Sequence, residues 1–356
     1  MSTMAQVEVE VTAGVDTHKD SHTAAALDAA GRLLGSAQFP ATAAGYAGLL
    51  AWLAGFGTVM LVGVEGTGVY GAGLARHLRA HGVAVVEVDR PDRKARRWQG
   101  KSDPVDAEAA ARAALARRAT GIPKDRDSRV EALRNLRVAR RSAIRHRADA
   151  QRQIHALLIT APEPLRAQLS ALRMAELLRH AATAVIDVDR ADEPAVAVMI
   201  ALQVLARRHQ QLTVEITQLD EFVTPLVEKI NPQLMALNGV GPDVAGQLLV
   251  TAGANPDRVR TEAAFAMLCG VAPLPASSGR TNRHRLNRGG DRQANAALYR
   301  VVLSRLRWDQ RTRTYVERRT KEGKSKKEII RCLKRYIARE IFPILTTPRK
   351  DLQAAA

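Results

Sequence analysis

A continuous apolar run, Thr58-Val59-Met60-Leu61-Val62-Gly63-Val64, constrains the fold of this chain more than any other stretch. Such a run is typical of a strand buried on both faces, in the centre of a parallel or mixed sheet. The run ends in Glu65, and helical patterns flank it, from Thr42 to Ala54 before it and up to about His81 after it. We therefore expect an α/β domain whose sheet carries helices on its faces.

Three further strands precede this run and one follows it. Alternation of valines with polar residues predicts a half-buried strand from Val7 to Asp16. Ser21 to Leu27 and Arg32 to Phe39 follow after short connections, which indicates an antiparallel meander, and Val83 to Val88 forms the last strand. The order of three strands, helix, strand, helix, strand and helix is that of a ribonuclease-H-like domain with a mixed sheet.

Four acids are positioned to meet in such a domain. Asp16 and Glu65 end two strands that are adjacent in this fold, and Asp103 and Asp106 begin a helix that extends to Arg118. Carboxylates this close repel one another unless cations compensate their charge. One or two Mg²⁺ ions would compensate it and would support phosphoryl transfer. The alternative is a plain helix start, with Asp103 as N-cap and Asp106 favoured by the helix dipole.

A second local pattern competes with this interpretation. Gly66 to Gly71 matches G-x-G-x-x-G after a strand, and Asp89 lies about where a ribose-binding acid would stand. A dinucleotide site, however, normally belongs to the first βαβ unit, whereas three strands precede this one. It would also leave the basic carboxyl-terminal half of the chain unexplained.

The charge of the chain indicates a polyanionic partner. There are 54 Lys+Arg against 36 Asp+Glu, a formal charge of +18, which favours nucleic acid over a membrane surface. Aromatic residues make up only 4%, so stacking is not expected to be the main binding mode. Two cysteines without a metal-ligand pattern fit a reducing cytoplasm, and no apolar run approaches the ~20 residues of a membrane helix.

The middle of the chain predicts two long helices. Ser128 to His155 is dense in arginine, including Arg137 and Arg141, and Pro194 to Ile230 carries apolar residues close to heptad spacing. With a break between them, they indicate a helical hairpin or coiled coil. The arginines favour a face that follows phosphates over a merely solvated face.

The carboxyl-terminal third contains two patterns suited to phosphates. Gly239 and Gly241 flank a short turn between helices, a helix-hairpin-helix pattern whose backbone N–H groups can meet a phosphate, although a plain αα-turn would look alike. Further on, Ser277 and Ser278 stand among guanidinium groups that could hold a phosphodiester during serine attack, unless the segment is only a basic loop. The guanidinium groups belong to Arg280, Arg283, Arg285 and Arg288.

Together these motifs resemble the DEDD-type transposases of insertion sequences, the IS one-ten family, also called bridge recombinases. The matching segments stand in the family's order. They are Gly14-Val15-Asp16, Glu65-Gly66-Thr67-Gly68-Val69-Tyr70, Lys101-Ser102-Asp103-Pro104-Val105-Asp106-Ala107, Gly239-Val240-Gly241-Pro242, and Gly270-Val271-Ala272-Pro273 leading into Ser278-Gly279. In this family the glycine turn follows a catalytic acid, which accounts for the dinucleotide-like pattern.

The resemblance implies three domains. They are a RuvC-like domain over 7–120 that binds Mg²⁺ through Asp16, Glu65, Asp103 and Asp106, a coiled-coil region over 126–230, and a mainly helical transposase domain over 231–345. It further implies that Ser278 forms a 5′-phosphoserine link to DNA and that homo-oligomers, from dimer to tetramer, build composite active sites. A noncoding guide RNA and action at the bacterial nucleoid, in the cytoplasm, are also implied.

The sequence thus predicts a DNA transposase that moves its own insertion sequence. One alternative is a RuvC-like, metal-dependent junction nuclease in which water attacks and Ser278 plays no part. Another is a nucleic-acid-binding protein without catalysis. A covalent protein–DNA intermediate would distinguish the transposase from the junction nuclease. Metal-dependent strand cleavage would exclude the nucleic-acid-binding protein without catalysis.

Overall fold

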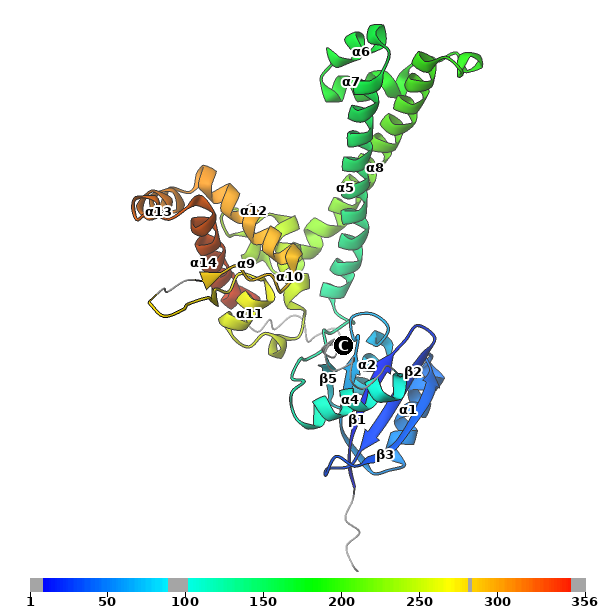
Figure 1. Cartoon of the computed structure of the whole chain (residues 1–356), viewed down its shortest axis with the longest axis vertical. Coiled ribbons are helices and arrows are strands. Elements are labelled where there is room, and N and C mark those ends of the chain that lie inside the picture. The colour runs from blue at the N-terminus through cyan, green and yellow to red at the C-terminus, as the bar shows by residue number, and fades with distance from the viewer. Residues whose placement is uncertain (1–8, 89–101, 281–283, 347–356) are drawn as a thin grey trace, which may run out of the picture. The chain divides into compact units, whose positions relative to one another are not determined.

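The computed structural model describes residues 9–88, 102–280 and 284–346 (Figure 1). Contacts between residues divide the chain into two compact units. Of the described residues, the first contains 9–88, 102–128, 252–265 and 346, and the second contains 129–251, 266–280 and 284–345. The first unit thus combines the amino-terminal domain with a short segment from the carboxyl-terminal third.

The first unit is built on a five-stranded mixed sheet with the order β3-β2-β1-β4-β5. Its strands are β1 (Glu10–Thr17), β2 (Ser21–Leu27), β3 (Leu33–Pro40), β4 (Thr58–Glu65) and β5 (Val85–Val88). β1, β2 and β3 form the antiparallel meander, while β4 pairs in parallel with both β1 and β5. This arrangement confirms the predicted ribonuclease-H-like sheet.

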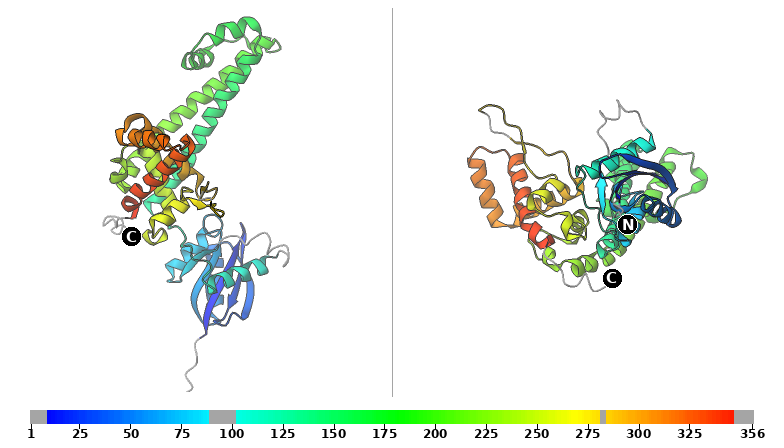
Figure 2. Two further views of the ribbon diagram at one scale, coloured as in Figure 1. Left: turned by 60° about the vertical axis from the view of Figure 1, so that its left-hand side comes forward. Right: turned by 90° about the horizontal axis from the view of Figure 1, so that it is seen from below.

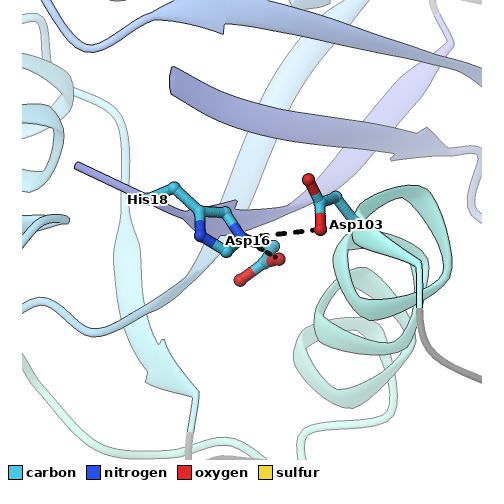
Figure 3. A group of neighbouring side chains, drawn as sticks. All are labelled: Asp16, His18 and Asp103. Carbon is cyan, nitrogen blue, oxygen red and sulfur yellow. Dashed lines mark hydrogen bonds and ion pairs between the residues drawn. The ribbon is translucent and has the colours of Figure 1, made fainter. Parts of the chain in front are cut away.

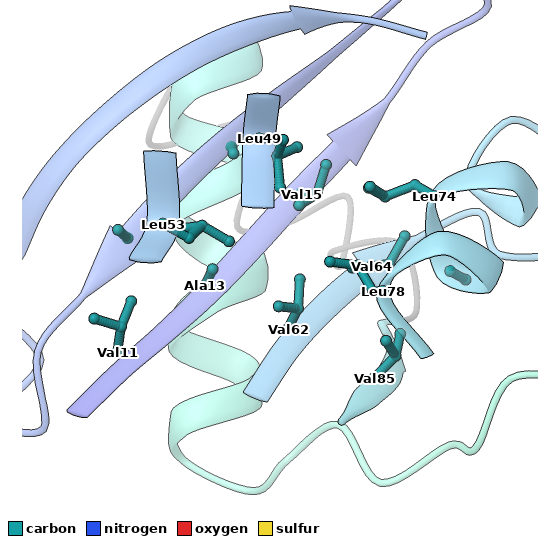
Figure 4. Close-up of a cluster of buried hydrophobic side chains, with 13 residues drawn as sticks. Val11, Ala13, Val15, Leu49, Leu53, Val62, Val64, Leu74, Leu78 and Val85 are labelled. Carbon is teal, nitrogen blue, oxygen red and sulfur yellow. The ribbon is translucent and has the colours of Figure 1, made fainter. Parts of the chain in front are cut away.

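One face of the sheet is covered by α1 (Ala43–Ala54) and α2 (Ala72–Ala80). Alternate residues of β1 and β4 point to this face, among them Val15 and Val64, and they pack with Leu49 and Leu74 from the two helices (Figure 4). All four of these side chains are fully buried. The main core of the unit therefore lies between the sheet and these helices.

The other face is covered by α4 (Asp103–Leu115), which contacts β1, β2 and β4. Gly14 and Gly63 are register partners on β1 and β4, and they form a flat patch under this helix. A Cβ atom on Gly14 would lie 2.0 Å from the backbone nitrogen of Ala111, and one on Gly63 would lie 3.0 Å from the carbonyl oxygen of Ala110. The sheet can be approached this closely because neither position carries a side chain.

This packing corrects one detail of the sequence analysis. Alternation predicted that β1 is half-buried, yet residues 11–16 are all buried. Thr12 and Gly14 supply the outward-facing side of the strand, and α4 covers that side. The alternation of polarity did not reveal the second covering layer because α4 buries alanines rather than large apolar side chains.

The second unit contains a long helical hairpin. Its two arms are α5 (Arg129–Thr160) and α8 (Pro194–Ile230), which run side by side (Figure 2). Between them lie α6 (Glu163–Ser170), α7 (Met174–Thr183) and the short 3-10 helix η1 (Val188–Arg190). α6 and α7 close one end of the hairpin through a buried cluster that includes Ile154, Leu169 and Leu202.

The rest of the second unit is mainly helical. Its helices are α9 (Pro232–Met235), α10 (Pro242–Ala252), α11 (Glu262–Leu268), α12 (Arg292–Trp308), α13 (Gln310–Lys321) and α14 (Lys326–Thr346), and the ends of α10, α11 and α14 extend into the first unit's segments. A short antiparallel pair, β6 (Leu274–Pro275) and β7 (His284–Arg285), interrupts them. Among the described residues, no helix is both long and apolar enough to cross a membrane.

Residues 252–265, including the 3-10 helix η2 (Pro256–Arg258), join the first unit through Asn255. The Asn255 side chain donates to the carbonyl oxygen of Pro123 at 3.0 Å and accepts from the backbone N–H of Asp125 at 3.3 Å. The predicted domains over 7–120, 126–230 and 231–345 stay a prediction. The two units described here are defined by contacts between residues and are not continuous in the sequence.

A polar cluster fastens the base of the hairpin. Asp243 of α10 accepts from Arg137 at 2.9 Å and from Arg140 at 3.2 Å, and it also pairs with Arg300 of α12. Burial alone would raise the pKa of Asp243, but the attraction of Arg137 and Arg300 outweighs it and lowers the pKa. The cluster therefore joins α5, α10 and α12 through one ionised carboxylate.

We expect Gly14→Ala to destabilise the first unit on the order of 3 kcal/mol, because the new methyl group would collide with the α4 backbone. Gly48→Ala on the exposed side of α1 is the matched control, since its Cβ would meet only Phe39 at 3.8 Å. The control should stabilise by about 0.5–1 kcal/mol. Thermal unfolding followed by circular dichroism measures both, and equal melting temperatures would contradict the close-packing account.

We expect Asp243→Asn to lower the free energy of unfolding by about 2 kcal/mol, less than for a fully buried pair because 30% of the Asp243 side chain is exposed. A lowered pKa gives stability above the ordinary carboxyl value of 3.8 and loses it as the pH falls through the folded value. Wild type and variant should therefore converge in urea titrations only as the pH falls below 3.8 and through the lowered pKa of Asp243. Asp149→Asn, at an exposed pair with Arg152, should change little at any pH.

Candidate metal centre and serine loop

The sheet brings two acids to the same edge and the same face. Val15 of β1 pairs with Val64 of β4, so Asp16 and Glu65 follow at equivalent positions of two parallel strands. Each acid stands two residues after a glycine of the flat patch, and residues two apart on a strand share a face. Both acids therefore lie on the face that α4 covers. The hydroxyl of Thr17 donates to the carbonyl oxygen of Glu65 at 2.8 Å and joins the two strand ends.

The start of α4 adds a further acid, and the chain after β1 adds a histidine (Figure 3). Nε2 of His18 lies 3.1 Å from Oδ2 of Asp16 and 3.5 Å from Oδ1 of Asp103. One ligand atom from each of these three residues lies within 4.8 Å of the other two. Asp16 is buried, whereas His18 and Asp103 are partly open to solvent. The group thus has a closed inner side and an accessible outer side.

The structure places the four predicted acids unequally. It brings Asp16 and Asp103 together, while Glu65 and Asp106 do not belong to this mutually close group. Asp106 is buried at 5% exposure in the first turn of α4, and Glu65 is half-buried at the end of β4. β4 and α4, which carry Glu65 and Asp106, both belong to the first unit. The role of these two acids as metal ligands stays a prediction.

Two details differ from the sequence analysis. Ser102, not Asp103, occupies the N-cap position of α4, so Asp103 is the first helical residue and its carboxylate faces His18. His18 itself was not predicted. The signal was the spacing Asp16-Thr17-His18, because residues two apart at a strand end project to the same side.

The donor set fits a divalent metal ion. Carboxylate oxygens are ligands for Mg²⁺ and Mn²⁺, and a neutral imidazole is a further ligand for Mn²⁺ and other transition metals. Two carboxylates and one imidazole within reach of one another could hold such an ion, with the exposed side left for water or substrate. Nothing in this arrangement selects Mg²⁺ specifically.

The glycine turn between β4 and α2 makes mostly internal contacts. The backbone N–H groups of Val69 and Gly71 both donate to the carbonyl oxygen of Gly66, which has a φ of +67°. The buried hydroxyl of Thr67 donates to Glu87 at 2.7 Å. These N–H groups are therefore engaged within the turn, and Asp89, the candidate ribose ligand, lies outside the described residues.

The predicted nucleophile lies in the loop between β6 and β7, and we call the described part of this loop, residues 276–280, the serine loop. Ser278 is exposed, and Gly279 beside it has a φ of +54° with open space around it. In Figure 1 the yellow serine loop projects away from the neighbouring helices of its unit. A serine at such a position is accessible to a large substrate.

The base of this hairpin is held by backbone contacts and one amide. A Cβ atom on Gly290 would lie 2.6 Å from the nitrogen of Gly270, so the two chain ends cross closely. Asn295 of α12 donates to the carbonyl oxygens of Cys269 and Gly270 at 3.0 and 2.9 Å and accepts from Lys334 at 2.8 Å. Burial lowers the pKa of Lys334. Burial also raises the pKa of the Cys269 thiol to about 12, so this thiol is not a competing nucleophile.

The predicted phosphate contacts separate into different groups. Arg280, Arg285 and Arg288 are exposed, whereas Arg283 lies outside the described residues. On α5, Arg141 is exposed, but the Arg137 side chain is only 12% exposed and pairs with Asp243. Arg137 therefore has a structural contact that the sequence pattern did not predict, and its predicted contact with phosphate remains untested.

The predicted helix-hairpin-helix has a short first helix. α9 has a single turn before the glycine turn, and α10 begins at Pro242. Gly239 has a φ of +79° and packs against α12, where a Cβ atom would lie 3.2 Å from Ser304. Nothing lies within 4 Å of a Cβ atom on Gly241. The close packing of Gly239 favours the plain αα-turn, and phosphate binding by either glycine stays a prediction.

Comparison with known proteins agrees with this architecture. A family model of DEDD transposases of the IS110 type, described as transposase, matches residues 13–161 and includes Asp16, Glu65, Asp103 and Asp106. A second model, described as the transposase IS116/IS110/IS902 family, matches residues 231–317 and includes Ser278.

A similar protein is the insertion element IS110 uncharacterized 43.6 kDa protein of Streptomyces coelicolor, which is 33% identical over 118 residues. The matched stretch covers 33% of this chain and 29% of that relative, so the chain spans less than a third of the relative's length. The two family models stand in chain order on the two parts that carry the acids and the serine. On this basis the chain belongs to the IS110 family of transposases.

Proposed function

We propose that this protein is a DNA transposase that cuts and rejoins strands to move its own insertion sequence. The observation that carries the proposal is the meeting of Asp16, His18 and Asp103 at one edge of a ribonuclease-H-like sheet. Such a group suits phosphodiester chemistry, and the net charge of +18 suits a nucleic-acid substrate. Action on DNA would place the protein at the bacterial nucleoid.

In this proposal one or two Mg²⁺ ions would be held by Asp16, Glu65, Asp103 and Asp106. His18 would assist these acids in holding the metal. A divalent cation bound there supplies positive charge to the phosphate oxygens. The residues of the chain have separate tasks. Asp16, which is buried, supplies a fixed carboxylate, while Asp103 and His18 lie on the open side where a phosphate can approach.

Ser278 is the proposed nucleophile. Its hydroxyl oxygen forms a bond to the phosphorus of the scissile phosphodiester, and the bond from phosphorus to the 3′ oxygen breaks. The serine proton leaves as the 3′ oxygen gains one, which yields a 5′-phosphoserine link and a free 3′ hydroxyl. Rejoining reverses these steps with a new 3′ hydroxyl. Arg280 and Arg285, and Arg283 by its place in the sequence, would hold the phosphate.

Further parts of the proposal concern partners. A noncoding RNA of the element would guide the protein to donor and target DNA, and homo-oligomers would combine the acids of one copy with the serine of another. The resemblance in sequence supports both. The exposed basic residues, Arg141 of α5 among them, are surfaces on which such nucleic acids could bind.

A metal-dependent junction nuclease is a second candidate function. The group of Asp16, His18 and Asp103 favours it equally, because it could direct water instead of serine onto a phosphodiester. A covalent intermediate distinguishes the two candidates.

We expect His18→Ala to weaken Mn²⁺ binding about tenfold and Asp16→Asn to weaken it further, because both remove ligand atoms of one site. Electron paramagnetic resonance of free Mn²⁺ during titration of the full chain measures the affinity. His146→Ala is the control, since this exposed histidine of α5 lies outside the group. Equal affinity in wild type and His18→Ala would show that His18 contacts Asp16 and Asp103 without acting as a ligand.

We expect Ser278→Ala to lower the yield of covalent protein–DNA adduct at least about a hundredfold, because it removes the attacking oxygen. Full-length protein, Mg²⁺, element-end DNA and RNA transcribed from the element's flanks are incubated, denatured and separated by gel electrophoresis. Ser277→Ala is the matched control and should keep the adduct, whereas Asp16→Asn should lose it. Cleavage without adduct that survives Ser278→Ala would overturn the serine mechanism in favour of the nuclease.

A further inference from the structure

A cavity of about 610 Å³ lies between α12, α13 and α14, within the second unit and apart from the serine loop. Its floor contains the buried side chains Val302, Leu333 and Ile337. Two of the chain's five tyrosines, Tyr315 and Tyr336, line it. Their rings meet edge to face with centroids 5.6 Å apart, and Tyr336 is 50% exposed. We call this cavity the tyrosine pocket.

Arginines surround the pocket, and their charges are not equally available. Arg305 is bound in a bidentate pair to Glu340 at 2.7 and 3.0 Å, and its Nε donates to the carbonyl oxygen of Asn238. By contrast, Arg311, Arg318 and Arg339 are exposed at the rim, where Arg318 makes only an exposed ion pair with Glu322 at 3.8 Å. The acids of the lining are already engaged, because Glu340 holds Arg305 and Asp309 caps α13. The rim therefore keeps positive charge.

Arginine and tyrosine are also paired with one another. The guanidinium carbon of Arg318 lies 5.4 Å from the centre of the Tyr315 ring, and that of Arg339 lies 6.0 Å from the centre of the Tyr336 ring. Each pair combines an aromatic ring with a phosphate-binding cation that lies over it. A nucleotide has the complementary parts, a flat base and a phosphate, joined within one residue.

We propose that the tyrosine pocket binds an unpaired nucleotide of single-stranded nucleic acid. The base would stack on Tyr336, the more exposed ring, while Arg318 and Arg339 hold the flanking phosphates. A base within a duplex is already stacked on both sides, so the pocket would select unpaired segments. This inference rests on the proposed function, because both require nucleic acid as the ligand. The tyrosine pocket would be a binding site separate from the acids and from Ser278.

The test is binding of the full-length chain to fluorescent oligothymidine and oligouridine of about 12 nucleotides, and to a duplex of equal length, by anisotropy. We expect Tyr336→Ala to weaken both single strands about tenfold and the duplex little, and Tyr336→Phe to bind as wild type because the ring remains. Tyr299→Ala, on an exposed tyrosine of α12 outside the pocket, is the matched control. The affinity of Arg339→Ala for the same strands is compared with that of Arg331→Ala, whose arginine does not line the pocket.

Crosslinking of wild-type protein to strands that carry 4-thiothymidine or 4-thiouridine keeps the test valid if Tyr336→Ala fails to fold. Crosslinks mapped by mass spectrometry to α13 and α14 around the pocket support the proposal. Weakening of only the DNA or only the RNA strand also supports it and identifies the source of the nucleotide. Wild-type affinity of Tyr336→Ala, equal weakening for duplex, or crosslinks confined to other elements would overturn it. Absence of all nucleic-acid binding by wild type would instead overturn the proposed function.

Discussion

The contact between α4 and the glycine pair Gly14 and Gly63 is the constraint on which the candidate metal centre depends. The two glycines are neighbours across β1 and β4, and the alanines of α4 lie directly against them. Asp16 and Glu65 follow two residues later on the same face. Close packing of α4 therefore places Asp103 next to Asp16 at the end of β1. A larger residue at either glycine would move the helix away and separate the acids that it brings together.

The opposite face of the sheet supplies the stability that such a site requires. Large side chains of β1 and β4 pack there against α1 and α2, as Figure 4 shows. Carboxylates held near one another repel and contribute little to folding without a cation. The same two strands thus serve two purposes, because alternate residues point to opposite faces. One face holds the core, and the other holds glycines followed by acids.

Polar contacts join several helices of the second unit. Asp243 joins α5, α10 and α12, and Asn295 holds the base of the hairpin that carries the serine loop. These contacts fix the supports and leave the loop itself exposed. Basic residues that the supports do not use remain at the surface, at the serine loop and at the tyrosine pocket. Such an arrangement suits a protein whose partners are large polyanions.

The sequence by itself determined the strands, the long helices and the positions of the acids. β2 and α8 occupy the predicted residues 21–27 and 194–230, because alternation, helical periodicity and proline are local signals. Only the tertiary structure decided the contacts between distant residues. It joined His18 to Asp103, covered β1 with α4, and turned Arg137 toward Asp243 while Arg141 stayed exposed. The physical reason is that an arginine or histidine has the same local pattern in either setting, and only the packing of distant segments fixes its burial and its partner.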